Sequence, residues 1–201
     1  MRSILLGALC LLLTACSEAP PALQPLSGDA VILAFGDSLT YGTGVNKAQS
    51  YPARLQQLTG RRVINAGVPG EISAQGIQRL PKLLKRHQPE LVILIHGGND
   101  FLRKLPAEQT RRHLQQMIKQ IRQADSQVLL VAVPRPGLLL ADAPLYQRLA
   151  EQDEIPLLPR LLADILQNTS TKSDLIHPNA EGYALLAEGI HAFLQEAGAL
   201  P

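Results

Sequence analysis

The 201-residue sequence contains no tryptophan, three phenylalanines and four tyrosines. A protein that binds single-stranded nucleic acid needs aromatic side chains on which bases stack, and a duplex binder needs a concentrated basic surface. The formal net charge is only +2, and basic residues alternate with acidic ones along the chain. We therefore expect no nucleic-acid partner.

Cysteine is nearly absent, since Cys10 and Cys16 are the two that the sequence contains. Both lie near the N-terminus, where Arg2, an apolar run over residues 4–13 and small residues follow one another, as in a secretory signal. The apolar run is too short to span a bilayer as a helix. Cys10 would leave with the signal, so the exported chain would carry one thiol and no internal disulfide.

The string LTAC at residues 13–16 resembles the lipobox of bacterial lipoproteins, in which cleavage precedes a cysteine that is then lipidated. The resemblance implies a lipoprotein signal peptide over residues 1–15 and a membrane tether on Cys16, because several acyl chains together anchor firmly. Ser17 resembles the pattern of outer-membrane sorting in enteric-type bacteria. We therefore expect an exported protein that is anchored in the bacterial cell envelope, at the periplasmic face of the outer membrane. A plain signal peptide with an incidental cysteine is the alternative.

Residues 16–29 are rich in proline, and we expect them to comprise the lipidated Cys16 and a flexible linker. From residue 30 onward there is no internal repeat and no second linker, which predicts one domain over residues 30–201. Short apolar runs there alternate with helical periodicity. Strands are expected at residues 30–35, 62–66, 91–95 and 128–133, with a possible fifth at 155–158, and helices at 51–58, 72–87, 107–124, 146–152 and 180–196.

Continuous apolar runs are typical of strands that are covered on both faces, and alternation of strand with helix predicts a parallel sheet between two helical layers. We therefore expect a three-layer αβα sandwich around a mostly parallel five-stranded sheet. Ligands bind outside the carboxyl ends of the strands in such sheets. The segments that follow the first three expected strands are GDS at 36–38, NAGVPG at 65–70 and HGGND at 96–100, and DLIH at 174–177 precedes the last helix.

Several common nucleotide-binding, catalytic and metal-binding motifs are absent from the sequence. The sequence has neither the GxxxxGK[ST] motif of a P-loop nor the GxGxxG motif of a dinucleotide site. The GxSxG elbow of ordinary α/β-hydrolases is absent because Thr40 occupies its last position. No HExxH or CxxC pair occurs, so we expect no metal site.

The four segments together resemble the SGNH, or GDSL, hydrolase family, whose blocks occur here in chain order as GDSL, NAGVPG, GGND and DLIH. The string GIQRLPKLLKRHQP at residues 76–89 is similar to one in the periplasmic thioesterase, lysophospholipase and arylesterase branch. The resemblance implies a flavodoxin-like SGNH hydrolase fold and a serine esterase that forms an acyl-enzyme without a cofactor. The implied substrates are small acyl esters, thioesters or lysophospholipids, and we expect a monomer.

The chemistry of these residues supports the same interpretation. A serine hydroxyl is a poor nucleophile until a base takes its proton, so Ser38 is the candidate nucleophile and His177 the candidate base. Asp174 lies three residues before His177. At that spacing its carboxylate can accept a hydrogen bond from the Nδ1–H group of His177 and stabilise the imidazolium that forms.

The family resemblance also implies three donors to the oxyanion of the tetrahedral intermediate: the backbone N–H of Ser38, the N–H of a second-block glycine, and the side-chain amide of Asn99. Gly67 and Gly70 compete for the second role. The family pattern places the donor glycine five residues after the asparagine, here Asn65, which favours Gly70 and makes Gly67 a turn residue.

The other polar residues near these blocks have simpler interpretations. Asp37 and Asp100 are expected to bond loop N–H groups rather than to act as bases. His96 either lines the pocket or packs beneath it, and packing is favoured. The remaining histidines fall on expected helices and have surface or packing roles: His87, His113 and His191.

The substrate is not determined by these patterns. The segment PRPGLLLADA at residues 134–143 could form an apolar lip for acyl chains or could be buried under a helix. A carbohydrate or peptidoglycan O-acetylesterase is the first alternative. An acyltransferase is another, and a non-catalytic envelope lipoprotein that binds lipid or glycan is an alternative of a different class.

Overall fold

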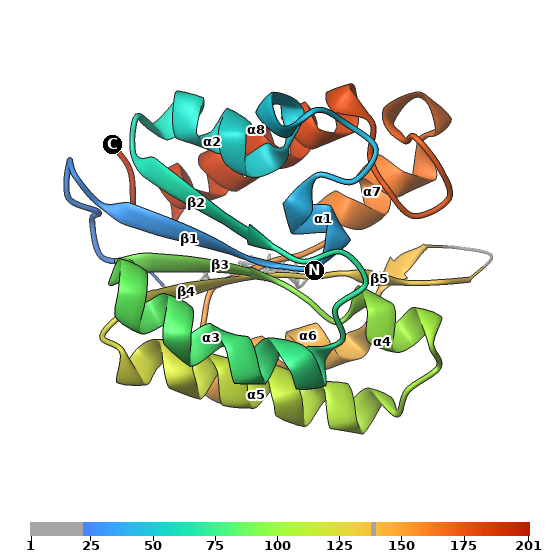
Figure 1. Cartoon of the computed structure of the whole chain (residues 1–201), viewed down its shortest axis with the longest axis horizontal. Coiled ribbons are helices and arrows are strands. Elements are labelled where there is room, and N and C mark those ends of the chain that lie inside the picture. Colours follow the sequence, from blue (N-terminus) through green and yellow to red (C-terminus); the bar gives the residue numbers. More distant parts are fainter. Residues whose placement is uncertain (1–21, 138–139) are drawn as a thin grey trace, which may run out of the picture.

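The computed structural model describes residues 22–137 and 140–201, so the expected signal peptide and Cys16 lie outside the described residues. A central five-stranded sheet lies between two layers of helices (Figure 1). The strand order is β2-β1-β3-β4-β7, and every neighbouring pair is parallel. The expected three-layer αβα architecture is therefore confirmed.

The strands begin and end close to the predicted positions. They are β1 (Val31–Gly36), β2 (Arg62–Gly67), β3 (Leu91–Ile95), β4 (Gln127–Val131) and β7 (Leu157–Leu158). The interior strands β1, β3 and β4 are almost wholly buried, as their apolar runs predicted. Strand β2 is largely exposed or half-buried, and the expectation that it is covered on both faces is wrong because it lies at the edge of the sheet.

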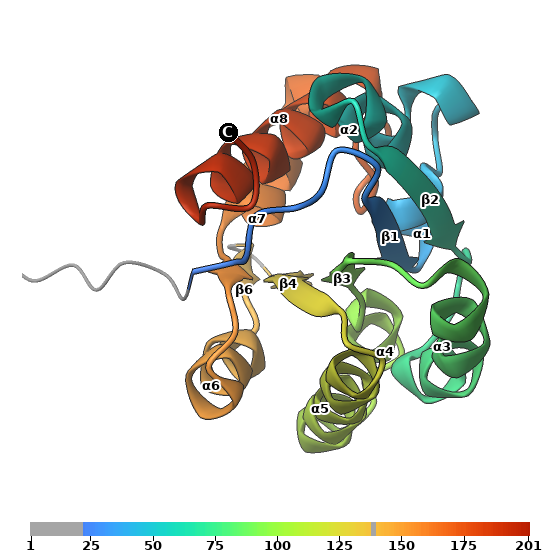
Figure 2. The same ribbon diagram turned by 90° about the vertical axis from the view of Figure 1, so that its left-hand side faces the viewer.

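Helices cover the sheet on opposite sides, with α1, α2, α7 and α8 on one face and α3, α4, α5 and α6 on the other (Figures 1 and 2). The helices are α1 (Ser38–Tyr41), α2 (Tyr51–Thr59), α3 (Ser73–His87), α4 (Gly98–Leu102), α5 (Ala107–Gln123), α6 (Pro144–Asp153), α7 (Leu161–Gln167) and α8 (Ala180–Glu196). No helix among the described residues is both long and apolar enough to cross a bilayer.

Four of these features were not predicted from the sequence: α1, α4, α7 and a small antiparallel pair formed by β5 (Pro134–Arg135) and β6 (Ala141–Asp142). Helices α1, α4 and α7 contain four, five and seven residues. One or two helical turns are too short to show the repeat of apolar residues that predicts a helix. The positions of these short helices depend instead on what they pack against.

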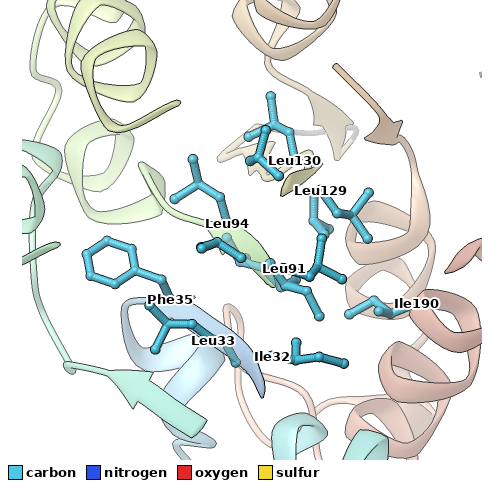
Figure 3. Packing of buried hydrophobic residues seen from close by; sticks show 14 of the residues in the cluster. Ile32, Leu33, Phe35, Leu91, Leu94, Leu129, Leu130 and Ile190 are labelled. Atoms are coloured by element: carbon cyan, nitrogen blue, oxygen red, sulfur yellow. The ribbon is translucent and has the colours of Figure 1, made fainter. Parts of the chain in front are cut away.

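The hydrophobic core lies on both sides of β1, β3 and β4 (Figure 3). Eight of its residues are labelled there: Ile32, Leu33, Phe35, Leu91, Leu94, Leu129, Leu130 and Ile190. In the register of the sheet, Gly36 at the end of β1 is paired with Gly67 of β2 and Ile95 of β3. The carboxyl ends of β1, β2 and β3 therefore meet at one edge of the sheet.

Residues 22–29 differ from the expected flexible linker. Leu23 and Leu26 are each only 6% exposed. Their N–H groups donate to the carbonyls of Ala197 (2.8 Å) and Ala199 (2.9 Å), just beyond α8. Burial of each leucine contributes about 1.5–3 kcal/mol and favours an ordered segment. The linker prediction is therefore wrong for residues 22–29, which are part of the packed domain.

Candidate active site

Ser38 directly follows the tight turn that joins β1 to α1. A Cβ on Gly36 would lie 2.1 Å from the carbonyl oxygen of Ile95, so only glycine allows this approach to β3. Asp37 then caps α1, because its Oδ1 accepts a hydrogen bond from the Leu39 N–H at 3.1 Å. Ser38 is consequently the first residue of the helix, at the carboxyl edge of the sheet.

The structure brings the three candidate catalytic side chains into one hydrogen-bonded line. The Nε2 atom of His177 lies 3.0 Å from Ser38 Oγ, and its Nδ1 atom lies 2.8 Å from Asp174 Oδ2. Because a carboxylate only accepts, the proton belongs on Nδ1, and Nε2 is free to accept the Ser38 hydroxyl. This geometry is that of a nucleophile, a base and an orienting acid.

The loop that carries Asp174 and His177 is held by its own backbone. Asp174 Oδ1 accepts hydrogen bonds from the N–H groups of Ile176 (2.8 Å) and His177 (2.9 Å). Partial burial would raise the pKa of the Asp174 carboxyl, but the hydrogen bonds from the His177 imidazole and the two N–H groups lower it below its ordinary value. Asp174 is therefore an ionised acceptor for His177.

Asn99 connects the first and second blocks. Its Nδ2 atom donates to Asp37 Oδ2 at 3.2 Å and to the backbone carbonyl of Glu71 at 3.1 Å. Burial raises the pKa of the Asp37 carboxyl above its ordinary value, although nearby hydrogen bonds and histidines oppose this. The amide is thus held between Asp37, the residue before Ser38, and Glu71, the residue after Gly70.

The two candidate glycines have different environments. A Cβ on Gly67 would lie 2.1 Å from the Tyr41 backbone nitrogen, and the Gly67 N–H already donates to Asn65 Oδ1 at 3.0 Å. Gly67 thus ends β2 where α1 crosses it, and is required for close approach rather than for a turn. Gly70 has a φ of +77°, and its N–H finds no acceptor within residues 22–137 and 140–201.

A cavity of about 650 Å³ opens beside Ser38, within the usual size range of ligand sites. Its polar lining includes Asp37, Asn99 and His177, and most of its other walls are apolar. The apolar lining residues are Leu39, Leu102, Val133, Pro134, Pro136, Leu140, Leu166, Leu175 and Ile176. The described part of the 134–143 segment therefore contributes to this apolar wall.

Glu71, Arg79 and His96 form an ionic cluster next to the NAGVPG segment that the sequence did not predict. Glu71 accepts hydrogen bonds from Arg79 Nε (2.8 Å) and Nη2 (2.7 Å), and from His96 Nε2 at 3.1 Å. The Arg79 guanidinium also lies 4.3 Å from the ring centroid of Phe35. Burial alone would raise the pKa of Glu71, but its partners lower it. The available signal was an acid directly after the Gly70 position and an arginine eight residues later.

His96 is fully buried, and its Nδ1 atom accepts a hydrogen bond from the Gly97 N–H at 2.9 Å. It therefore packs beneath the site rather than lining the cavity. Asp100 is also buried and accepts from the Ser73 N–H at 2.8 Å, a framework contact of the predicted kind. The described residues contain no group of three histidine, cysteine, aspartate or glutamate side chains that could hold a metal ion.

The sequence is similar to a known protein family and to several characterised proteins. The model of the GDSL-like lipase/acylhydrolase family matches residues 34–185. Thioesterase 1/protease 1/lysophospholipase L1 of Escherichia coli (strain K12) is 33% identical in an alignment 172 residues long, which covers 82% of this chain and 83% of the relative. Esterase TesA of Pseudomonas aeruginosa is 30% identical in an alignment 202 residues long, which covers 94% of this chain and 96% of the relative.

A solved structure gives the same result in three dimensions. The crystal structure of AlinE4, an SGNH-hydrolase family esterase, is 33% identical and superposes with a TM-score of 0.66, covering 85% of this chain and 97% of that chain. The match to the family model includes all four sequence blocks, from GDSL at residue 36 to DLIH at residue 177. The chain therefore belongs to the GDSL-like lipase/acylhydrolase family.

Proposed function

We propose that this protein is a serine esterase that hydrolyses carboxylic ester and thioester bonds of acyl substrates through an acyl-enzyme. The observation that carries the proposal is the line of hydrogen bonds from Ser38 through His177 to Asp174, beside an open cavity. Each chemical role is filled by a protein group, so the reaction calls for no cofactor.

In the acylation step, His177 Nε2 takes the proton of Ser38 as Oγ attacks the acyl carbonyl. Asp174 holds the imidazole in the required tautomer and stabilises its charged form. The N–H groups of Ser38 and Gly70 and the amide of Asn99 donate to the oxyanion. The leaving alcohol or thiol receives its proton from His177, and water, activated by the same base, then releases the acid.

The apolar walls of the cavity support an acyl chain as the part of the substrate that it holds. An acetyl group would not need a cavity of about 650 Å³ lined by leucine, valine and proline, so the O-acetylesterase alternative is less well supported. Purified protein should hydrolyse p-nitrophenyl esters from two to sixteen carbons, with activity that persists beyond eight carbons. Activity confined to acetyl esters would favour the O-acetylesterase, and no activity at any length would favour a binding lipoprotein or an acyltransferase.

Leu175 provides a test of the acyl-chain role. This residue lines the cavity and is 83% exposed, so a bound chain would cover it. Partial burial of a leucine contributes about 1–2 kcal/mol. We therefore expect Leu175→Ser to lower kcat/KM for dodecanoyl esters about 5- to 30-fold, and for acetyl esters less than twofold. Leu185→Ser is the matched control, since Leu185 is exposed on α8 and does not line this cavity. An equal loss at both chain lengths would contradict the assignment.

The pH dependence of kcat/KM tests the orienting acid. Partial burial would raise the pKa of Asp174, but hydrogen bonds from the His177 imidazole and two N–H groups hold it below its ordinary value, so the carboxylate stays ionised at pH values where a free aspartate begins to take up a proton. We therefore expect protonation of Asp174 to add no second step to any loss of kcat/KM above the ordinary pKa of aspartate, so that the slope of log kcat/KM against pH does not exceed one there. A slope of two, with the fold intact by circular dichroism, would mean that a second group must be ionised.

We also propose that the protein is exported and anchored through lipidated Cys16 at the periplasmic face of the outer membrane, as a monomer without a nucleic-acid partner. The support is the lipobox-like string at residues 13–16 together with Ser17. Cells that are fed an alkyne-labelled fatty acid should label the wild-type protein but not Cys16→Ala. Equal labelling of both proteins would argue against this anchor.

A further inference from the structure

The cavity beside Ser38 contains one side chain that the proposed mechanism does not use. Lys172 is the single lysine or arginine among the described residues that line it. Its side chain is partly buried, and its Nζ atom donates to the carbonyl of Leu166 at 3.1 Å. No carboxylate of the described chain lies within 4.0 Å of that ammonium. A partly desolvated cation is stabilised when an opposite charge pairs with it.

The contact with Leu166 explains only part of this arrangement. Leu166 lies in the last turn of α7, where a free carbonyl and the helix dipole attract a cation. An ammonium has three N–H donors, so this contact leaves two. The same cavity is lined by the apolar side chains of Leu140, Leu166 and Leu175, none of which can accept a hydrogen bond.

The other charged groups at the site are already engaged. Asp37 lines the cavity but accepts from the Leu39 N–H and the Asn99 amide, and Asp174 accepts from His177. Gln167 is also engaged, since its Nε2 atom donates to the Leu140 carbonyl at 2.6 Å. The cavity thus has mostly apolar walls and a positive charge that pairs with no carboxylate of residues 22–137 and 140–201.

We propose that Lys172 pairs with an anionic group, a carboxylate or a phosphate, that the ester substrate carries away from its reacting carbonyl. This inference rests on the proposed esterase function and specifies its substrate class. An ammonium in a partly desolvated wall forms a stronger hydrogen bond with an anion than with a neutral oxygen. A neutral ester of the same length fills the same apolar walls but leaves the ammonium unpaired.

A matched pair of substrates tests the carboxylate arm. Mono-p-nitrophenyl suberate carries a free carboxylate at the far end of its acyl chain, and its methyl ester has the same chain without the charge. We expect wild-type protein to have a kcat/KM about tenfold higher for the free acid, and Lys172→Met to remove that preference while changing the neutral ester less than twofold. The preference should weaken in 0.5 M salt. Lys172→Arg should retain it, and Lys47→Met, outside the cavity, is the matched control.

Octyl phosphate and octanol test the phosphate arm as competitive inhibitors of neutral ester hydrolysis. We expect the inhibition constant of octyl phosphate to be at least fivefold lower for wild-type protein than for Lys172→Met. The inhibition constant of octanol should be the same for both proteins. A response in one arm alone identifies which anion is recognised. If Lys172→Met changes charged and neutral ligands by the same factor in both arms, Lys172 only caps α7 and the inference is wrong. Failure of the esterase proposal would differ, because neutral ester hydrolysis would then not depend on Ser38.

Discussion

Replacement of Ser38 by alanine is expected to lower kcat for p-nitrophenyl butyrate by about 10⁴-fold or more, while the thermal unfolding midpoint changes little. Without Oγ there is no nucleophile to form the acyl-enzyme, and only transition-state binding by the oxyanion donors would remain. The hydroxyl faces the cavity and its partner is His177, so its removal frees only His177 Nε2, which lines the same open cavity and can bond to water there. Steady-state kinetics measure kcat, and a thermal melt of the same preparation measures the unfolding midpoint.

Two controls accompany this variant. Ser170→Ala removes an exposed serine that does not line the cavity, and it should keep activity within twofold. A serine-directed fluorophosphonate should label the wild-type protein and fail to label Ser38→Ala. His177→Ala should be comparably impaired, and the double variant should be no worse than either single one, because the residues act as a unit. Retention of more than a few per cent of activity by Ser38→Ala would end the serine esterase proposal.

Replacement of Asn99 by alanine is expected to lower kcat about 100- to 1000-fold, with KM changed less than threefold. In the proposed mechanism the Asn99 amide exchanges its contact with Asp37 Oδ2 for the oxyanion, a charge that develops only in the transition state, so its loss affects the chemical step rather than substrate binding. A saturation curve with a short-chain ester separates the two parameters.

The structural role of Asn99 requires its own control. Its amide also connects Asp37 to the Glu71 carbonyl, so a thermal melt must show that the variant remains folded. Asn46→Ala is the matched control, because Asn46 is an asparagine at a 3₁₀ turn that does not line the cavity. A rise in KM with kcat unchanged would assign Asn99 to substrate binding instead of oxyanion stabilisation.

The three framework acids explain how the four blocks keep their relative positions. Asp37 binds the Leu39 N–H and the Asn99 amide, and Glu71 binds Arg79 and His96. Asp100 joins the start of α3 to the third block. Each acid therefore connects two segments that are distant in sequence, and together they hold the loops around Ser38.

Local patterns in the sequence predicted much of this architecture. Apolar runs placed β1, β3 and β4 within one or two residues of their observed bounds, and α8 begins and ends where its periodicity predicted. The short helices α1, α4 and α7 escaped prediction because one or two turns have no period. Leu23 and Leu26 escaped it because two leucines in a proline-rich segment give no sign of the partner that buries them.

By itself the sequence determined the order of the main strands and the longer helices, the four family blocks and the candidate residues Ser38, Asp174 and His177, since these are properties of neighbouring residues. Only the tertiary structure decided which of these groups meet. The 3.0 Å contact between Ser38 and His177 joins residues 139 positions apart, and it depends on the register of the sheet and the packing of α8. Long-range packing likewise decided the Glu71 cluster and the place of Lys172 in the cavity. Such contacts arise where separate elements pack together, and a local pattern does not encode that geometry.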